Sequence, residues 1–391
     1  MNRWLRWTPL LLLPLAAFVV HEEQDPVVIP AGFHWRNNSW LSGEEFNAIA
    51  DNKLQRVYYK VLDIDWNEIH GAHPISTVHI PWQWRGYDEY TRPNTNSEEL
   101  VPCIYITNNA ILHLDAASTT QLGHNLLRKL RMEAPNGMHG VLLDCDWTAT
   151  TKARFFELVR MMNDSLDVPL TVTIRLHQYA APKKTGVPPA DRGMLMVYNV
   201  GKLQEAIPTN SIFDEATAAP YFKNAPRYPL PLDIALPAYS WGVQFRNGKF
   251  LGLVDDETVR DAERWSVIGP AQNSVSQVVS EHRYFPSLHL GDEIRWERIA
   301  PDAMAQAADL ARTAVNTDTF SVAFFEIGAR TFQELKADEV RTVLERFGSV
   351  RHISGADVFN ADPATDTIVS VHADSAAVIM ATDSTMPVTK P

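Results

Sequence analysis

Two aspartates follow a short apolar segment near the middle of the chain, and their spacing is the first feature that could do chemistry. In the stretch GMHGVLLDCDWTAT, Asp144 and Asp146 come directly after an apolar run that begins at Val141. Residues two apart on a β-strand point to the same side of it. Paired carboxylates can divide acid and base roles in hydrolysis. A single Asp at a strand end also serves as a helix cap, and both interpretations stay open.

Polar and aromatic side chains end the other apolar segments as well. Carboxylates and amides hydrogen-bond to hydroxyl groups, and aromatic rings stack on sugar faces, so these residues together favour a polyhydroxylated ligand. The alternative is structural: a scaffold role for the two aspartates near residue 64, and a salt-bridged scaffold for the arginine and histidine near residue 176. The candidate ligand-binding residues are Asp63, Asp65, Trp66, Asn108, Trp147, Arg175, His177, Tyr198, Asn199, Tyr239 and Trp241, with Glu326 as a further carboxylate.

The elements that must position these residues are strands that are apolar along their whole length. Such strands are typical of parallel sheets that are covered on both faces. Amphipathic helices are expected at 118–132 and 151–166, and the alternation predicts an α/β fold, a (β/α)₈ TIM barrel, whose strands end at one mouth. The eight predicted strands lie at 56–66, 75–82, 100–109, 139–147, 169–178, 193–201, 231–242 and 320–328.

One long segment interrupts the repeat between the seventh and eighth strands. Residues 243–319 form this insertion, and a hairpin turn is expected at Asn247 and Gly248 inside it. We therefore expect one barrel domain over 23–355. The segment 356–391 is rich in Ala, Asp, Thr and Ser, which predicts a weakly ordered tail.

The N-terminal segment has the pattern of an export signal. Arg3 and Arg6 precede an apolar run at 9–20, and charged residues follow. Residues 1–22 are therefore predicted to be a signal peptide or an N-terminal anchor. The chain would then be exported, to a periplasmic, extracellular or outward-facing membrane-anchored location. Cys103 and Cys145 fall inside predicted strands, where buried free thiols are expected.

Composition excludes some classes of partner. The 391 residues carry a formal net charge of −12 and no basic cluster after the first few residues, which argues against nucleic acid. His, Cys, Asp and Glu show no convincing metal-ligand spacing, and no cofactor motif is present, so neither a metal nor a cofactor is predicted. A membrane contact is expected only through the N-terminal segment.

At three motifs the chain resembles chitinase-like family 18 glycoside hydrolases. The fourth strand of that family ends in D-x-x-D-x-D-x-E, and in VLLDCDWT the second and third aspartates match Asp144 and Asp146. MVYN places Tyr198 and Asn199 on the family's M-x-Y-D, and ALPAYSWG resembles its seventh strand at Tyr239. The family also often has an insertion between strands seven and eight. The resemblance implies a TIM barrel that binds a polysaccharide or an oligosaccharide.

The departures from the family affect catalysis directly. Thr148 stands where the family has its general acid Glu, and a threonine cannot protonate a glycosidic oxygen near neutral pH. Two interpretations follow. The favoured one is an exported glycoside hydrolase-like enzyme that acts on a polysaccharide with Asp144, Asp146 and Glu326 as catalytic residues. The alternative is a non-catalytic glycan-binding protein of the same fold, or an envelope structural or assembly protein.

Overall fold

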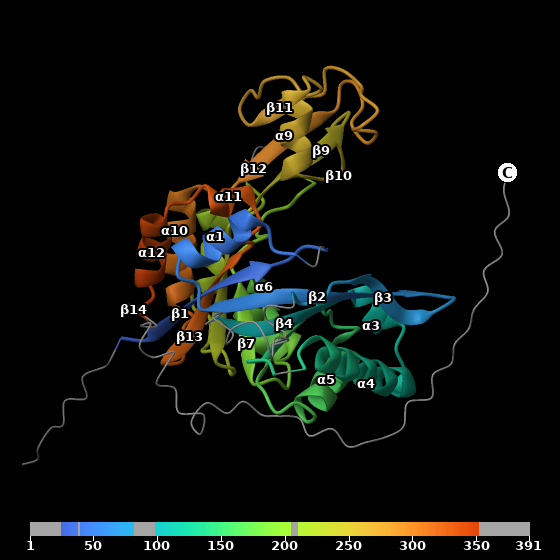
Figure 1. Cartoon of the computed structure of the whole chain (residues 1–391), viewed down its shortest axis with the longest axis vertical. Helices are drawn as coiled ribbons and strands as arrows, with labels where there is room; N and C mark the ends of the chain where they lie inside the picture. The colour runs from blue at the N-terminus through green and yellow to red at the C-terminus, as the bar shows by residue number, and fades with distance from the viewer. Residues whose placement is uncertain (1–24, 38–39, 82–97, 136, 205–209, 352–391) are drawn as a thin grey trace, which may run out of the picture.

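Eight parallel strands close into a barrel in this computed structural model, which describes residues 25–37, 40–81, 98–135, 137–204 and 210–351 (Figure 1). Each strand pairs with the next along the chain, and the last pairs with the first. The predicted (β/α)₈ barrel is therefore confirmed. Its strands are β1 (Val27–His34), β2 (Arg56–Asn67), β4 (Glu99–Ile106), β5 (Val141–Asp144), β6 (Leu170–Arg175), β7 (Arg192–Met196), β8 (Leu232–Pro237) and β13 (Thr319–Phe325).

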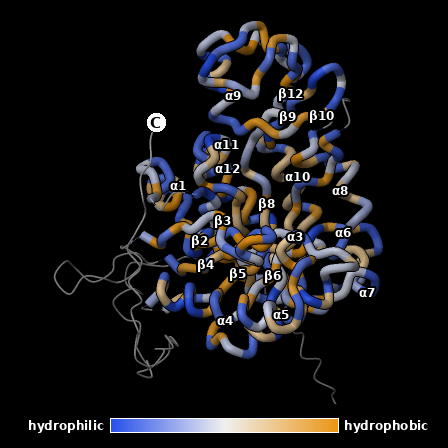
Figure 2. Tube along the Cα trace, turned by 90° about the vertical axis from the view of Figure 1, so that its right-hand side faces the viewer, coloured by the Kyte–Doolittle hydropathy of each residue, from blue (hydrophilic) through white to orange (hydrophobic). Residues whose placement is uncertain are grey.

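Helices cover the outside of this barrel, and hydrophobic stretches run along β4, β5 and β6 in the middle of the molecule (Figure 2). Both predicted amphipathic helices form: α4 buries Leu126 and Leu130, and α5 buries Phe155 and Leu158. The helices are α1 (Gly43–Asp51), α3 (Asn108–Leu112), α4 (Ala116–Glu133), α5 (Lys152–Asn163), α6 (Leu176–Ala180), α7 (Pro182–Thr185), α8 (Glu215–Phe222), α10 (Pro301–Arg312), α11 (Arg330–Gln333) and α12 (Ala337–Glu345).

The first barrel strand differs from the prediction. The predicted strand at 75–82 is not part of the barrel, because β3 (Gly71–Thr77) pairs antiparallel with β2 and forms a hairpin that projects from it (Figure 1). The barrel begins instead with β1, so it runs from residue 27 to residue 325 and not from residue 56. The two errors cancel in the strand count, and VLLD remains the fourth strand.

The composition of β1 explains why it was not predicted. Pro30 and Gly32 are residue types that are disfavoured inside β-strands. In the barrel, the Pro30 carbonyl accepts a hydrogen bond from the Gln55 backbone N–H at 2.7 Å. A Cβ on Gly32 would lie 2.3 Å from Cγ2 of Ile327, so only glycine fits this close approach.

The insertion folds into a small lobe beyond the C-terminal end of β8 (Figure 1, top). Asn247 and Gly248 have φ values of 52° and 71°, as a two-residue turn with positive φ requires, so the predicted hairpin is confirmed. Val259 and Ile294 belong to a separate hydrophobic core in this lobe. Its elements are β9 (Ser240–Arg246), β10 (Lys249–Asp255), α9 (Asp256–Arg264), β11 (Val275–Gln277) and β12 (Glu293–Arg298).

Three predicted features complete the comparison. Cys103 and Cys145 are buried free thiols, as expected. The predicted N-terminal signal or anchor, 1–22, and the predicted tail, 356–391, lie outside the described residues.

After α12, the short strand β14 (Ser349–Val350) pairs with β1 at the start of the barrel.

A buried ion pair links neighbouring strands at the beginning of the barrel. Asp233 on β8 is 1% exposed and accepts two hydrogen bonds from the Arg192 guanidinium on β7, both 2.9 Å long. It also accepts one from the Ser321 backbone N–H on β13 at 2.7 Å. The Ser321 hydroxyl in turn accepts a hydrogen bond from Arg56 on β2. Four strands are therefore tied together by one polar cluster.

Replacing Asp233 with alanine is expected to destabilise the fold by about 3–5 kcal/mol, because it leaves the partly buried Arg192 guanidinium and the Ser321 backbone N–H without their carboxylate partner. The measurement is the free energy of unfolding from urea denaturation. Asp309→Ala is the matched control. It removes an exposed ion pair with Arg346, and we expect a loss of about 0–1 kcal/mol. Equal losses in the two variants would contradict a structural role for the buried cluster.

Candidate functional site

A row of polar side chains crosses the barrel interior near its C-terminal end. In the sheet register Asp63 on β2 is beside Tyr105 on β4, and Tyr105 is beside Asp144 on β5. Residues that are neighbours in register point to the same side of a sheet. The Thr173 hydroxyl on β6 donates a hydrogen bond to Oδ1 of Asp144 at 2.7 Å, so β6 contributes to the same row.

Asp144 is the carboxyl group whose protonation the barrel changes most. Burial raises its pKa to about 6, and the nearby charges of Asp146 and Asp63 act in the same direction. The hydrogen bond from Thr173 and the charge of Arg175 partly oppose this rise in the pKa. Asp144 can therefore hold a proton in weakly acidic solution, where an ordinary aspartate is ionised.

Asp146 is held differently, although it lies only two residues away. The Arg175 guanidinium binds both of its carboxylate oxygens, with Nε 2.5 Å from Oδ1 and Nη2 on Oδ2. A bidentate pair of this kind fixes the orientation of both side chains. Arg175 also affects His177, which is exposed: desolvation and the Arg175 charge lower the pKa of this histidine.

Thr148, at the position of the chitinase general acid, belongs to a turn of hydroxyl groups. Its Oγ1 lies 2.8 Å from that of Thr150 and 3.2 Å from that of Thr151. The Thr151 hydroxyl donates to Oδ1 of Asn108 at 2.6 Å, so Asn108 is occupied in fixing this turn. The turn leads into α5 and contains no ionisable group.

An aromatic cluster lines the barrel at the ends of β1, β7, β8 and β13. Phe325 lies at its centre, with ring centroids 5.3 Å from Tyr198, 5.6 Å from Tyr239 and 5.6 Å from Trp35. Trp241 extends the cluster from Tyr239, at 5.2 Å. We call these five residues the aromatic wall. Tyr198 also lies near the acidic side, because the charges of Asp144 and Arg175 act on its hydroxyl.

Hydrogen bonds fix the orientation of two rings in the aromatic wall. The Tyr239 hydroxyl donates to Oδ1 of Asn199 at 2.6 Å, and Asn199 adopts a left-handed conformation with φ of 56°. Nε1 of Trp241 donates to Oε2 of Glu297 at 2.9 Å. Burial raises the pKa of both Tyr198 and Tyr239, so their hydroxyls stay protonated. Rings held in this way are pre-organised for stacking.

A buried lysine lies between the polar row and the aromatic wall. Nζ of Lys60 donates to Oδ2 of Asp63 at 2.9 Å and to Oδ1 of Asn37 at 2.6 Å, and it lies 5.6 Å from the centroid of the Trp35 ring. Lys60, Tyr105, Trp35 and Phe325 were not among the predicted residues. Lys60 and Tyr105 appear as ordinary members of apolar strands, and Trp35 follows the strand that was not predicted.

Three predicted residues lie elsewhere or play another part. Trp147 is 4% exposed and packs against Phe155 of α5, so it belongs to the core and not to the mouth. Trp66 stacks on His113 at 3.8 Å, on the opposite side of β2 from Asp65. Asp65 accepts hydrogen bonds from Thr107 and Asn109, which lower its pKa.

Glu326 is separated from the two central aspartates by its contacts. Its Oε1 accepts a hydrogen bond from Nε of Arg36 at 3.3 Å. Burial raises the pKa of Glu326, and the charges that act on it come from Arg36, His34 and Glu45. Among the described residues it has no contact with Asp144 or Asp146. The structure therefore does not bring the predicted catalytic carboxylates together as one group.

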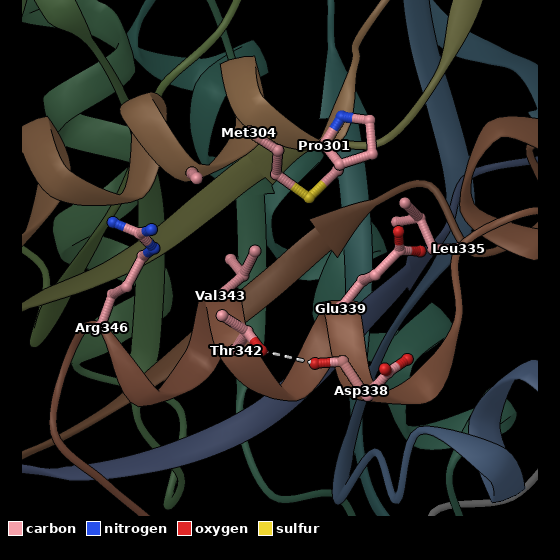
Figure 3. A pocket seen from close by; sticks show the side chains of 9 residues that line it. Pro301, Met304, Leu335, Asp338, Glu339, Thr342, Val343 and Arg346 are labelled. Carbon is pink, nitrogen blue, oxygen red and sulfur yellow. Dashed lines mark hydrogen bonds between the residues drawn. The ribbon is translucent and has the colours of Figure 1, made fainter.

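One surface pocket lies away from the mouth, on the outer helical layer. It has a volume of about 180 Å³ and is formed by α10 and α12, with Met304 and Val343 among its lining residues (Figure 3). Asp338, Glu339, Thr342 and Arg346 also line it. Within the described ranges, no group of three or more His, Cys, Asp or Glu side chains could hold a metal ion.

Similar solved structures are TIM-barrel proteins, many of them glycoside hydrolases. The Bacillus cereus spore cortex-lytic enzyme SleL is 14% identical, with 85% of this chain and 76% of that chain covered and a TM-score of 0.46. A Chromobacterium violaceum chitinase is 11% identical, with 81% and 99% covered and a TM-score of 0.47. A GH113 β-1,4-mannanase is 9% identical, with 83% and 99% covered and a TM-score of 0.43.

Similarity at this level gives no information on the chemistry of this chain. No protein-family model matches the sequence, and no curated protein matches it. The function must therefore be argued from the geometry of the mouth.

The raised pKa of Asp144 predicts a pH-dependent cost to stability. A carboxyl group whose folded pKa of about 6 exceeds its unfolded value of 3.8 favours the folded state most when it is protonated. This contribution is lost as the pH rises from about 4 to about 6. Over that pH range, the free energy of unfolding of the wild type should therefore fall by up to about 3 kcal/mol relative to that of Asp144→Asn.

Urea denaturation of both proteins at pH 4.5 and pH 7.5 measures this difference. Asp309→Asn, which changes an exposed aspartate on α10, controls for the general effect of removing one carboxylate. A stability difference between wild type and Asp144→Asn that does not change with pH would show that Asp144 titrates as an ordinary aspartate.

Proposed function

We propose that the chain is a glycoside hydrolase-like enzyme that acts on a polysaccharide at the barrel mouth, with Asp144 as its general acid. One observation carries this proposal. A half-buried carboxyl group with a pKa of about 6 points into the same end of the barrel as the aromatic wall. A general acid works best when its pKa lies near the operating pH, and burial is the usual way in which a carboxyl group reaches that range.

The other groups have roles that follow from their contacts. Rings of the aromatic wall would stack on a sugar face, because hydrogen bonds of Tyr239 and Trp241 fix the planes of these two rings. The Asp146–Arg175 pair presents hydrogen-bond acceptors and donors to sugar hydroxyls beside Asp144. Glu326, paired with Arg36, is the least favourably placed of the three predicted catalytic residues.

The charge pattern of segment 1–22 supports the further proposal that the protein acts outside the cytoplasm. Among the described residues, no helix combines the length and the apolar character of a membrane span. Cell fractionation and N-terminal sequencing of the mature protein test this. We expect the protein in an exported fraction, either shortened or membrane-bound. A full-length protein in the cytoplasmic fraction would contradict export.

A second candidate function is non-catalytic glycan binding. The observation that favours it is the hydroxyl turn at Thr148, where related barrels in the resembled family carry their acid. A barrel that has lost this acid could retain its aromatic wall and hold a glycan without cleaving it. An envelope assembly role would use the same fold without a sugar in the mouth.

A glycan panel with separate assays for binding and for cleavage distinguishes these functions. We expect wild type to cleave at least one polysaccharide. Asp144→Asn should lower the rate by ~10²–10⁴-fold, because it removes the general acid and retains the acceptor for Thr173. Trp35→Phe, which keeps an aromatic ring but shortens the wall, should mainly weaken binding.

Asp309→Asn is the matched control, since this residue lies on α10 outside the mouth. Binding without cleavage by the wild type would establish the second candidate. Cleavage that is unchanged in Asp144→Asn would refute Asp144 as the acid. Neither binding nor cleavage across the panel would refute a carbohydrate function.

A further inference from the structure

We infer that Asp63 is the second catalytic carboxylate, acting as general base opposite Asp144, and that the reaction inverts the anomeric configuration. This inference rests on the proposed hydrolytic function. Asp63 appears in the sequence only as one of several candidate binding residues. Three observations carry the assignment: the position of Asp63 in the sheet register, the free oxygen on each of the two carboxylates, and the contacts that occupy the other carboxylates of the mouth.

The register places Asp63 and Asp144 at one level of the barrel. Tyr105 of β4 is the register neighbour of both, so the two aspartates lie on strands separated by a single strand. Neighbouring strands are ~4.8 Å apart, which sets the two backbones ~10 Å from each other. Side chains that point inward in a closed barrel converge, so the carboxyl groups are nearer than this. Inverting glycosidases need ~6.5–9.5 Å between their carboxyl groups, and retaining ones only ~5–5.5 Å.

Each of the two carboxylates is fixed through one oxygen. Asp63 receives the Lys60 ammonium on Oδ2 at 2.9 Å. Asp144 receives the Thr173 hydroxyl on Oδ1 at 2.7 Å. A carboxylate that is anchored on one side keeps a fixed orientation and leaves its second oxygen for a ligand. An acid and a base for one reaction need this arrangement.

The second oxygen of Asp63 is the more informative one. Asp63 is 8% exposed, and its Oδ1 is buried without a hydrogen-bond partner among the described residues. An unsatisfied buried acceptor costs ~1–3 kcal/mol, so a donor that reaches Oδ1 is strongly favoured. A nucleophilic water supplies such a donor, and deprotonation of this water is the task of a general base.

The other carboxylates of the mouth have different partners or another place on their strands, and none of them has a buried oxygen without a partner among the described residues. Both oxygens of Asp146 are bound by Arg175, and Glu326 is bound by Arg36. Asp65 accepts two side-chain hydrogen bonds on Oδ1 and lies two residues farther along β2 than Asp63, opposite His73 of β3. Asp63 and Asp144 are therefore the pair that can face one glycosidic bond from two sides.

The charges around the two carboxyl groups differ. Asp63 faces the Lys60 ammonium in a buried ion pair. Asp144 faces Asp146, Arg175 and Asp63, and its burial favours the protonated form up to a pH of about 6. A pair of carboxyl groups in two such different environments has the division of roles that acid–base hydrolysis requires.

The reaction can be written with every atom placed. A water molecule gives one proton to Oδ1 of Asp63 while its oxygen bonds to the anomeric carbon from one face of the sugar. The glycosidic C–O bond breaks on the other face, and Asp144 gives its proton to the leaving oxygen. Asp63 ends protonated and Asp144 ends ionised, and proton exchange with solvent restores both. One displacement at the anomeric carbon inverts its configuration.

The first test uses the wild-type protein and a polysaccharide or oligosaccharide that it cleaves. Proton NMR of the product, recorded within minutes of cleavage and before mutarotation, reports the anomeric configuration. The inference predicts inversion. Retention would overturn it, because retention proceeds through a covalent intermediate with a nucleophilic carboxylate and not through a water activated by a base.

The second test uses Asp63→Asn, with Asp309→Asn as the matched control. We expect kcat to fall ~10²–10⁴-fold while glycan binding is kept, and we expect the acidic limb of the pH–rate profile to disappear. Because Asp63→Asn leaves Lys60 without its counter-charge, the double variant Lys60→Met with Asp63→Asn is measured beside it. Both Tm values are recorded, so that loss of activity can be separated from loss of fold.

The outcomes separate this inference from the function on which it rests. Cleavage that needs Asp144 but is unaffected by Asp63→Asn would overturn the base and leave the hydrolase. A wild type that binds glycans and cleaves none would overturn both. Inverted product, together with folded Asp63 variants that bind but do not cleave, would establish the pair.

Discussion

The closure of the barrel by β1 determines the rest of the mouth. This strand pairs with β13 on one side and with β2 on the other, and closure turns the inward face of every strand into one shared interior. Trp35 follows β1 directly and meets Phe325 from β13 and Lys60 from β2. Gly32 permits this closure, since any side chain there would collide with Ile327.

The interior formed in this way has one aromatic side and one side with carboxylates. The proposed chemistry depends on both. Aromatic rings from β1, β13 and the ends of β7 and β8 exclude water from one side. Carboxylates from β2 and β5 occupy the other side, each with its own partner: Lys60, Thr173 or Arg175. Asp146 is bound at both oxygens by the Arg175 guanidinium, whereas Asp144 accepts a hydrogen bond from the Thr173 hydroxyl and interacts with Arg175 only through its charge. Two aspartates two residues apart therefore lie in different electrostatic surroundings.

The sequence predicted the barrel but not all of its mouth, and the reasons are physical. Apolar runs such as VLLD and the stripes of α4 and α5 reflect burial, which a single sequence records well. β1 was not predicted because Pro30 and Gly32 ordinarily interrupt a strand. In the barrel, pairing with β13 outweighs this local preference. The pairing of Asp146 with Arg175, of Glu326 with Arg36 and of Lys60 with Asp63 depends on contacts across strands, which spacing along the chain cannot give. Trp147 was predicted at the mouth for the same reason, whereas its ring packs against Phe155 in the core.

The central claim is that a sugar ring lies between the aromatic wall and Asp144. The most direct measurement is a crystal structure of Asp144→Asn, which retains the fold and should not cleave, bound to an oligosaccharide from the polysaccharide that it recognises. The account predicts a sugar stacked on Trp35 or Tyr198, with the glycosidic oxygen within hydrogen-bonding distance of residue 144. An oligosaccharide bound on the outer helices or on the lobe, with the barrel mouth holding only solvent, would contradict it.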